Sequence, residues 1–320
     1  MEIMKKDITI LINRSEITAG TRGSSLGPDA VKTAARNKGK SFFGNYPIEE
    51  IKDVNYLLDH PTKYQFAKRI DGLFSIYSSL NDSVSKLLLA NKFPLVIAAD
   101  HGSAGGTIAG IKSAFPEKRI GIIWIDAHAD IHTPYTTPSG NMHGMPLATV
   151  LNQDNLACKI NDLSDETLDY WTKLKNIGGI SPKANAEDLV FIAVRDTEEQ
   201  EDAIMDELNI KNYKVSEVHE KGIAKVISEI ESKLSDCDVI YVSFDVDSMD
   251  PEMTSHGTGT PVKNGLSPIE AEEILTLLAA NDKTVCIEFV EVNPCLDEKT
   301  NKMADVTADL VESVLETLGK

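Results

Sequence analysis

The chain has 320 residues, 42% hydrophobic and 26% charged, proportions that are ordinary for a globular protein with a full core. Its formal net charge is −18, from 32 basic and 50 acidic residues, which argues against a nucleic-acid partner because phosphate neutralisation needs a basic surface. No apolar run reaches the roughly 18 residues of a membrane span, and the polar N-terminus shows no signal peptide, so we expect no membrane partner and a cytoplasmic location.

Strand and helix patterns alternate along the chain. Apolar, β-branched runs bounded by turn residues predict eight strands, near 7–13, 49–54, 94–99, 119–125, 188–194, 212–216, 238–244 and 283–290. Apolar side chains spaced by three or four residues predict helices, most clearly at 64–91, 197–208, 217–234, 268–280 and 302–318. This alternation predicts a single-domain, three-layer α/β/α fold with a mostly parallel sheet of about eight strands.

The sequence shows no sign of a domain boundary or of disulfide bonds. No Pro/Gly/Ser-rich linker or repeat interrupts it, so we expect one domain over residues 1–320, with the irregular segment 151–187 running over the surface of the sheet. The cysteines have no close pair, which favours reduced, buried thiols over a disulfide framework; they are Cys158, Cys237, Cys286 and Cys295.

The predicted strand 119–125 leads directly into Asp126, His128 and Asp130. Residues two apart in an extended chain share a face, so these three side chains can converge on one point. A single aspartate or histidine at a strand end more often caps a loop. Three desolvated polar groups, however, would cost several kcal/mol without a partner, and a metal ion is the partner that the pattern favours.

Other predicted strands also end in acidic or imidazole groups, and ligands of open α/β sheets bind at such carboxyl ends. Two histidines and four aspartates form the candidate metal-ligand set: His101, Asp126, His128, Asp130, Asp245 and Asp247. Four carboxylates balance two divalent cations, and six ligands are too many for one tetrahedral zinc site. Oxygen ligands with some imidazole and no thiolate favour manganese, and two such ions can lower the pKa of a water molecule held between them.

Two further features near these strand ends favour structural roles. Asp100 and Asp250 are expected to hydrogen-bond backbone or to orient ligands. The glycine-rich stretch 105–107 suggests a phosphate-binding loop only weakly, because no Lys-Ser or Lys-Thr follows it.

Several short motifs carry a family resemblance: Asp-Ala-His-Ala-Asp at 126–130, Ser-Phe-Asp-Val-Asp at 243–247, Gly-Thr-Pro at 259–261 and Glu-Val-Asn-Pro at 291–294. With them the sequence resembles the ureohydrolase family over nearly its whole length. The segment 136–146, Thr-Thr-Pro-Ser-Gly-Asn-Met-His-Gly-Met-Pro, resembles the arginase version of a stretch that separates arginases from agmatinases.

The resemblance implies hydrolysis of L-arginine to L-ornithine and urea by two Mn²⁺ per chain, in a homotrimer or homohexamer. It implies that the six candidate ligands bind these ions, that Asp130 passes a proton to the leaving amine and that His143 is a proton shuttle. It implies further that Glu291 holds the cationic guanidinium and that Ser139 and Asn141 bind the substrate carboxylate. Asp196 and Glu198 would lie near the α-amino group, and His132 is expected to offer one more donor to the carboxylate.

Departures from the family pattern keep alternatives open. His132 stands where Asn is usual, Glu198 where Asp is usual, and Ala98-Ala99 where Gly-Gly is usual, while the loop 251–260 is longer by one residue. A related ureohydrolase acting on agmatine, guanidinobutyrate or formimidoylglutamate remains an alternative. So do a catalytically silent amino-acid-binding relative and a metal-dependent deacetylase.

Overall fold

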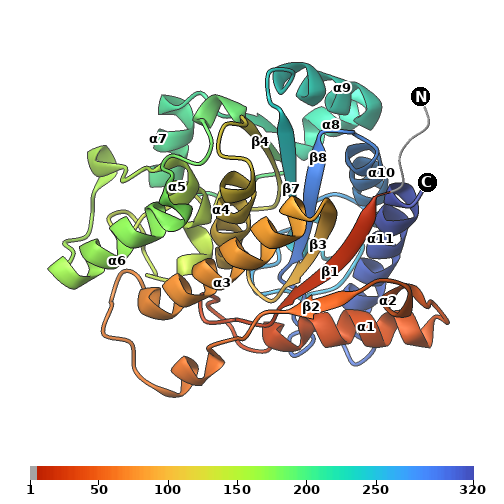
Figure 1. Cartoon of the computed structure of the whole chain (residues 1–320), viewed down its shortest axis with the longest axis horizontal. Coiled ribbons are helices and arrows are strands. Elements are labelled where there is room, and N and C mark those ends of the chain that lie inside the picture. Colours follow the sequence, from red (N-terminus) through yellow and green to blue (C-terminus); the bar gives the residue numbers. More distant parts are fainter. Residues whose placement is uncertain (1–5) are drawn as a thin grey trace.

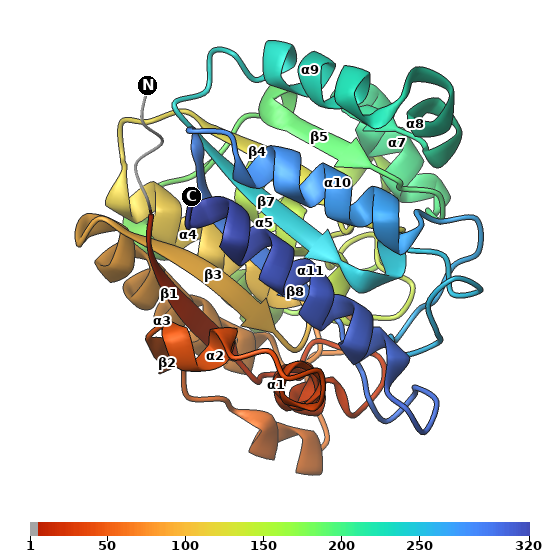
Figure 2. The same ribbon diagram turned by 90° about the vertical axis from the view of Figure 1, so that its right-hand side faces the viewer.

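The computed structural model describes residues 6–320, and the first five residues, on which the expectation about a signal peptide partly rests, lie outside this range. The described chain forms one eight-stranded sheet in the order β2-β1-β3-β8-β7-β4-β5-β6, with parallel pairing throughout (Figures 1 and 2). The strands are β1 Asp7–Asn13, β2 Ile48–Glu50, β3 Lys92–Ala98, β4 Ile120–Ile125, β5 Leu189–Ile192, β6 Lys211–Tyr213, β7 Val239–Asp245 and β8 Thr284–Val290.

Helices cover both faces of the sheet, as Figure 2 shows. One layer contains α1 Gly27–Asn37, α2 Phe42–Asn45, α8 Val215–Lys221, α9 Ile223–Lys233, α10 Pro268–Ala279 and α11 Lys302–Leu318. The other contains α3 Ile70–Leu89, α4 Ala104–Ala114, α5 Pro146–Leu151, α6 Asp165–Lys175 and α7 Glu199–Glu207. The predicted three-layer α/β/α architecture is confirmed.

Several predicted elements were too long, three of them for clear local reasons. The strand predicted at 49–54 ends at Glu50, because Asp53 Oδ1 accepts a hydrogen bond from the Asn55 amide and starts a turn. The helix predicted at 64–91 begins at Ile70, since Arg69 lies in the left-handed region with φ 60°. The helix predicted at 217–234 is divided into α8 and α9 at Gly222, where φ is 80°.

The glycine-rich stretch after β3 belongs to the buried helix α4 and is not a phosphate-binding loop. A Cβ on Gly105 would lie 2.2 Å from Tyr77 Oη, and one on Gly106 would lie 2.8 Å from Tyr77 Cα. These glycines therefore allow α3 and α4 to approach each other closely.

The segment 151–187 is more ordered than expected, because it contains α6 and buries Trp171, whose Nε1 donates to Asp154. All four cysteines are free, as predicted. Cys237 and Cys286 are buried, as predicted. The prediction is wrong for Cys295, which is exposed, and Cys158 is half-buried.

Four neighbouring strands, β3, β8, β7 and β4, form the centre of the sheet, and each runs in the same direction. Their carboxyl ends therefore meet at one edge, where the candidate ligands follow. Among residues 6–320, no helix is long and apolar enough to cross a membrane.

Candidate metal centre and substrate pocket

His101 follows β3 and points its Nδ1 atom at a group of carboxylates. Nδ1 lies 2.9 Å from Asp126 Oδ2, 3.1 Å from Asp130 Oδ2 and 3.2 Å from Asp245 Oδ2. The ring is buried and stacks on Trp124, with centroids 3.9 Å apart and planes at 5°. Nδ1 nevertheless has no well-formed hydrogen bond to any described residue. A buried nitrogen and three carboxylate oxygens around one point fit a divalent cation.

His128 forms a second group beside the first. Its Nδ1 lies 3.1 Å from Asp247 Oδ2 and 3.5 Å from Asp126 Oδ1. Asp126 thus belongs to both groups, with one oxygen directed at each histidine. The structure therefore brings all six predicted metal ligands together, in two groups that share Asp126.

Burial and crowding set the charges of these aspartates. Burial, together with the charge of Asp126, raises the pKa of Asp130 to about 6. Burial and the charge of Asp247 hold the pKa of Asp245 well above its usual value. For Asp126, burial alone would raise the pKa, but the nearby His101 and His128 side chains outweigh burial and lower it. Bound cations would reduce the repulsion among these clustered carboxylates, so the donor set fits two metal ions.

Backbone amides and side-chain donors orient the aspartates. Trp124 Nε1 donates to Asp126 Oδ2 at 3.0 Å, and the His128 amide donates to Asp126 Oδ1 at 2.8 Å. Asp130 and Glu291 lie in the left-handed region, with φ of 48° and 69°. Such conformations cost on the order of 1–3 kcal/mol for residues other than glycine and are concentrated at functional sites.

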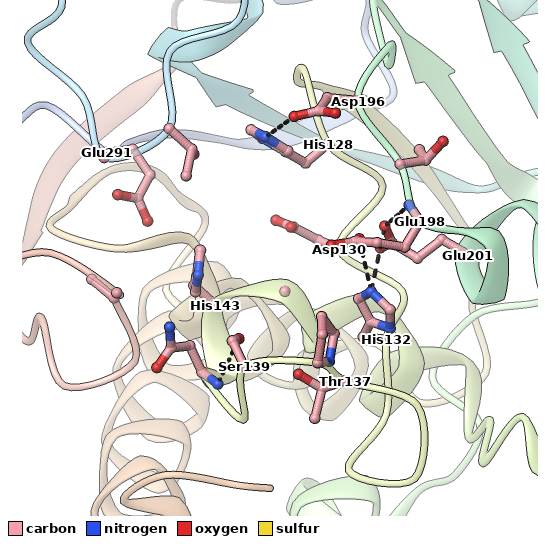
Figure 3. Close-up of a pocket in the computed structure, with 18 of the residues that line it drawn as sticks. His128, Asp130, His132, Thr137, Ser139, His143, Asp196, Glu198, Glu201 and Glu291 are labelled. Atoms are coloured by element: carbon pink, nitrogen blue, oxygen red, sulfur yellow. Dashed lines mark hydrogen bonds and ion pairs between the residues drawn. The ribbon is translucent and has the colours of Figure 1, made fainter. Parts of the chain in front are cut away.

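A cavity of about 360 Å³ opens next to the two histidine groups. Figure 3 shows Glu291 and His143 on one side of it and His132, Glu198 and Glu201 on the other, with His128 and Asp130 between them. Its further lining includes Ala19, Gly20, Thr21, Thr137, Pro138, Ser139, Asn141, Gly144, Asp196, Thr197, Gly259 and Thr260. Every predicted substrate-binding residue lines this cavity.

Glu291 and His143 lie at the end of the cavity near His101. Glu291 Oε1 accepts a hydrogen bond from the His101 amide at 2.9 Å, and burial holds the pKa of Glu291 well above its usual value. The His143 amide donates to Thr18 O at 3.3 Å, which fixes the backbone beneath the ring. Burial and the neighbouring imidazoles lower the pKa of His143 to about 4, so its ring is neutral near pH 7.

The predicted carboxylate-binding turn is held from both sides. Ser139 Oγ accepts from the Asn141 amide at 3.1 Å, and Lys68 Nζ donates to Asn141 Oδ1 at 3.1 Å. Lys68 also donates its backbone amide to Gly140 O. A lysine thus lies beside the turn that we expect to bind a carboxylate, although the sequence offered no reason to select it.

His132 is engaged at both ring nitrogens. Nε2 lies 2.9 Å from Glu198 Oε2 and 3.6 Å from Glu201 Oε2, and Nδ1 lies 3.1 Å from Thr136 Oγ1. The hydrogen bond from His132 is the main cause that lowers the pKa of Glu198 to about 2. The ring therefore orients Glu198, and both of its nitrogens are engaged by protein groups instead of being free for the substrate carboxylate, as the sequence suggested. Asp196 is exposed, 3.6 Å from His128 Nε2.

Sequence reasoning missed residues whose roles depend on contacts between distant segments. Arg195 donates to four backbone carbonyls, those of Ala193, Asp247, Val262 and Lys263, and so ties the loop after β5 to the connection between β7 and α10. Ser243 Oγ lies 2.6 Å from His101 Nε2. The motif around Ser243 was recognised, but nothing in its spacing indicates that the hydroxyl faces a histidine 142 residues away.

Comparisons with known proteins agree with this geometry. The model of the arginase family matches residues 6–316. The arginases of Bacillus subtilis and Brevibacillus brevis are 34% and 35% identical to this chain, over 98% and 97% of it and 98% of each relative. The solved structure of Bacillus caldovelox arginase superposes with a TM-score of 0.80 at 33% identity, over 98% of both chains. The chain therefore belongs to the arginase family and is a hydrolase of carbon–nitrogen bonds in linear amidines.

Proposed function

We propose that this chain hydrolyses L-arginine to L-ornithine and urea with two Mn²⁺ per chain. The observation that carries the proposal is the pair of histidine–aspartate groups that share Asp126 at the wall of the cavity. Relatives named arginase, similar over nearly their full length, support the same substrate.

One ion would be held by His101, Asp126, Asp130 and Asp245, and the other by Asp126, His128 and Asp247. When bound, two Mn²⁺ would supply an activated water molecule and positive charge near the reacting carbon. The predominance of carboxylate ligands favours manganese over a softer metal.

The protein's own groups would handle the guanidinium and the protons. Glu291 faces the cavity with one oxygen held by the His101 amide, so the other can bind the cationic guanidinium. Asp130, at the cavity wall, would take a proton from the attacking water and give it to the leaving amine. His143 is neutral near pH 7 and can accept a proton for transfer to solvent.

The polar groups that line the cavity outside the two metal groups suit an α-amino acid. Ser139 and Asn141, with Lys68 behind them, would bind the carboxylate. Asp196 and Glu198 would lie near the α-ammonium group, with Glu198 held in place by His132. An acidic protein also attracts a small cationic substrate.

Other ureohydrolase substrates remain the second candidate, because His132 and Glu198 alter the rim. A formimidoylglutamase structure superposes with a TM-score of 0.74, but its 18% identity shows a common fold alone. We further propose one catalytic domain in a cytoplasmic homotrimer or homohexamer.

The proposal is tested by measuring urea release from L-arginine, agmatine and guanidinobutyrate with Mn²⁺ added, together with metal content per chain. We expect two ions per chain and the highest catalytic efficiency with L-arginine. Two ions with a different preferred substrate would replace arginase activity by another ureohydrolase activity. One ion per chain would contradict the binuclear centre.

A further inference from the structure

Charge is divided unevenly around the cavity. Five carboxylates line it and no lysine or arginine does; the acidic residues are Asp130, Asp196, Glu198, Glu201 and Glu291. Such a lining attracts the guanidinium and ammonium groups of a substrate but repels a carboxylate, because like charges at close range destabilise each other. A substrate with a carboxylate therefore needs positive charge beside the part of the wall that receives it.

Lys68, in the loop before α3, supplies a positive charge at such a place. Its Nζ donates to Asn141 Oδ1 at 3.1 Å, and its backbone amide donates to Gly140 O at 2.8 Å. Within residues 6–320 its ammonium group forms no ion pair with an acidic side chain. The charge of Lys68 is thus held beside the turn expected to bind the substrate carboxylate, and no protein carboxylate neutralises it.

The same contact sets the direction of the Asn141 amide. A lysine ammonium group can only donate, so the Asn141 atom beside it must be the oxygen, and the amide nitrogen lies on the other side. Gly20, which lines the cavity, is next to that nitrogen: a Cβ placed on Gly20 would lie 3.0 Å from Asn141 Nδ2. Lys68 therefore presents a donor, and not an acceptor, at the wall of the cavity.

Two arginines extend the positive charge on this side of the cavity. Arg69 follows Lys68 in the chain, and Arg22 follows Thr21, which lines the cavity. Burial and the nearby charge of Arg22 lower the pKa of Arg69, so the two guanidinium groups are close to each other. Both donate to backbone carbonyls, and neither forms an ion pair within the described chain. In a chain of net charge −18, these cations favour an anionic group at this side.

The acidic wall formed by Glu198 and Glu201 is, by contrast, already engaged by protein groups. Glu198 Oε2 faces His132 Nε2 at 2.9 Å, and Glu201 accepts the backbone amides of Ile131 and Glu198 at 3.3 Å. An ammonium group of the substrate must share these oxygens, whereas a carboxylate meets a cation that has no acidic partner. The carboxylate should therefore contribute more than the ammonium group to the choice of substrate.

We propose that Lys68 is a specificity-determining residue that selects guanidino compounds with a carboxylate, through its charge and through the direction it gives to the Asn141 amide. The inference rests on the proposed function, since it concerns the substrate of the same site. It ranks three compounds: L-arginine first, then 5-guanidinopentanoate, which is arginine without its α-amino group, and last agmatine, which is arginine without its carboxylate.

The direct test measures urea release from these three compounds by the Mn²⁺-loaded native chain and by Lys68→Met. We expect kcat/KM for the two carboxylates to fall about tenfold in the variant, the scale of one hydrogen bond to a charged group, while the value for agmatine changes little. Lys68→Arg keeps the charge and a donor, so it should retain most of the preference. Lys63→Met is the matched control, because Lys63 lies in the same loop but pairs with Glu166, and it should leave all three values unchanged.

A second measurement uses binding in place of turnover. Calorimetry compares L-ornithine with 1,4-diaminobutane, which is ornithine without its carboxylate, and Lys68→Met should weaken the binding of L-ornithine alone, by about tenfold.

Agmatine hydrolysed as well as 5-guanidinopentanoate by the native chain, or an equal fall for all three compounds in Lys68→Met, would overturn the inference. If Lys68→Met does not fold, the ranking in the native chain decides alone. Urea release from none of the three compounds would instead refute the proposed function, and the binding of L-ornithine would then still test the role of Lys68.

Discussion

Asp126 is the residue that both halves of the proposed metal centre share. Its two oxygens face His101 and His128, and they are oriented by Trp124 and by a backbone amide. Asp126→Asn should abolish measurable turnover and lower the metal content below two ions per chain, while the large core keeps the chain folded. Metal analysis and circular dichroism of the same sample check this.

A matched control is Asp250→Asn at the end of the same edge of the sheet. Within residues 6–320, the Asp250 side chain accepts hydrogen bonds only from the backbone amides of Glu252 and Asn264, as the sequence predicted for a structural aspartate. This variant should keep both ions. Equal metal loss in the two variants would mean that any charge change at this edge disturbs the site, and the special position of Asp126 would be refuted.

His143 lies at the cavity but belongs to neither metal group. As a proton shuttle it should contribute on the order of 10²-fold to the rate, the low end of general acid–base catalysis. His143→Ala is therefore expected to reduce kcat by about that factor at unchanged metal content. Loss of one ion in this variant would place His143 among the ligands and contradict the shuttle role.

Selectivity for the substrate carboxylate is also decided by single residues. Arginine should be preferred over agmatine, which has no carboxylate, on the order of 10²-fold in kcat/KM, or roughly 2.7 kcal/mol. Asn141→Ala should reduce this preference to roughly tenfold, because it should lower kcat/KM for arginine and leave kcat/KM for agmatine unchanged. Agmatine is the internal control: an equal fall for both substrates would indicate a general disturbance of the pocket.

Among the elements, those that carry ligands were the best predicted. A buried strand such as β4 is uniformly apolar and stops at its first aspartate, so its end is visible in the sequence. Helix α4 was missed because Gly105, Gly106 and Gly110 have low helix propensity, and the close contact with α3 that requires them cannot be seen locally. Side-chain partners such as Arg195 or the His132–Glu198 pair depend on loops whose paths no periodic pattern predicts.

The segment between α6 and β5 contains a buried lysine with a testable effect. Lys183 is 2% exposed, and its Nζ donates to Lys175 O and Ile180 O without an acidic partner. Burial lowers its pKa from 10.5 to about 8. Between these values the unfolded chain binds more protons than the folded one, so stability should rise with pH.

The free energy of unfolding should rise by about 3 kcal/mol between pH 8 and pH 10.5, because each unit of difference in the pKa of Lys183 corresponds to about 1.4 kcal/mol. Urea unfolding of the native chain and of Lys183→Met at both pH values isolates this contribution. The difference between the two chains should shrink as pH rises, and a constant difference would contradict a lysine that is charged and buried at neutral pH.

At the scale of the whole molecule, the sheet concentrates negative charge at one edge. Four buried aspartates without cations repel one another, so metal removal should lower stability as well as activity. At a free Mn²⁺ concentration of 100 times Kd, each site contributes about 2.7 kcal/mol to the free energy of unfolding. Thermal unfolding after chelation and after Mn²⁺ is restored measures this, and an unchanged Tm would contradict metal binding by the folded state.

The strand order also determines which parts of the site can fold first while the chain is being synthesised. β8 is the last strand in the chain, yet it is inserted between β3 and β7. The His101 amide donates to Glu291, which follows β8, and the two residues are 190 residues apart in sequence. Contacts between such distant segments form slowly. The group around His128 needs only the adjacent strands β4 and β7, so a nascent chain could assemble it first. The group around His101 must wait for β8 to leave the ribosome, although every one of its ligands has by then been made.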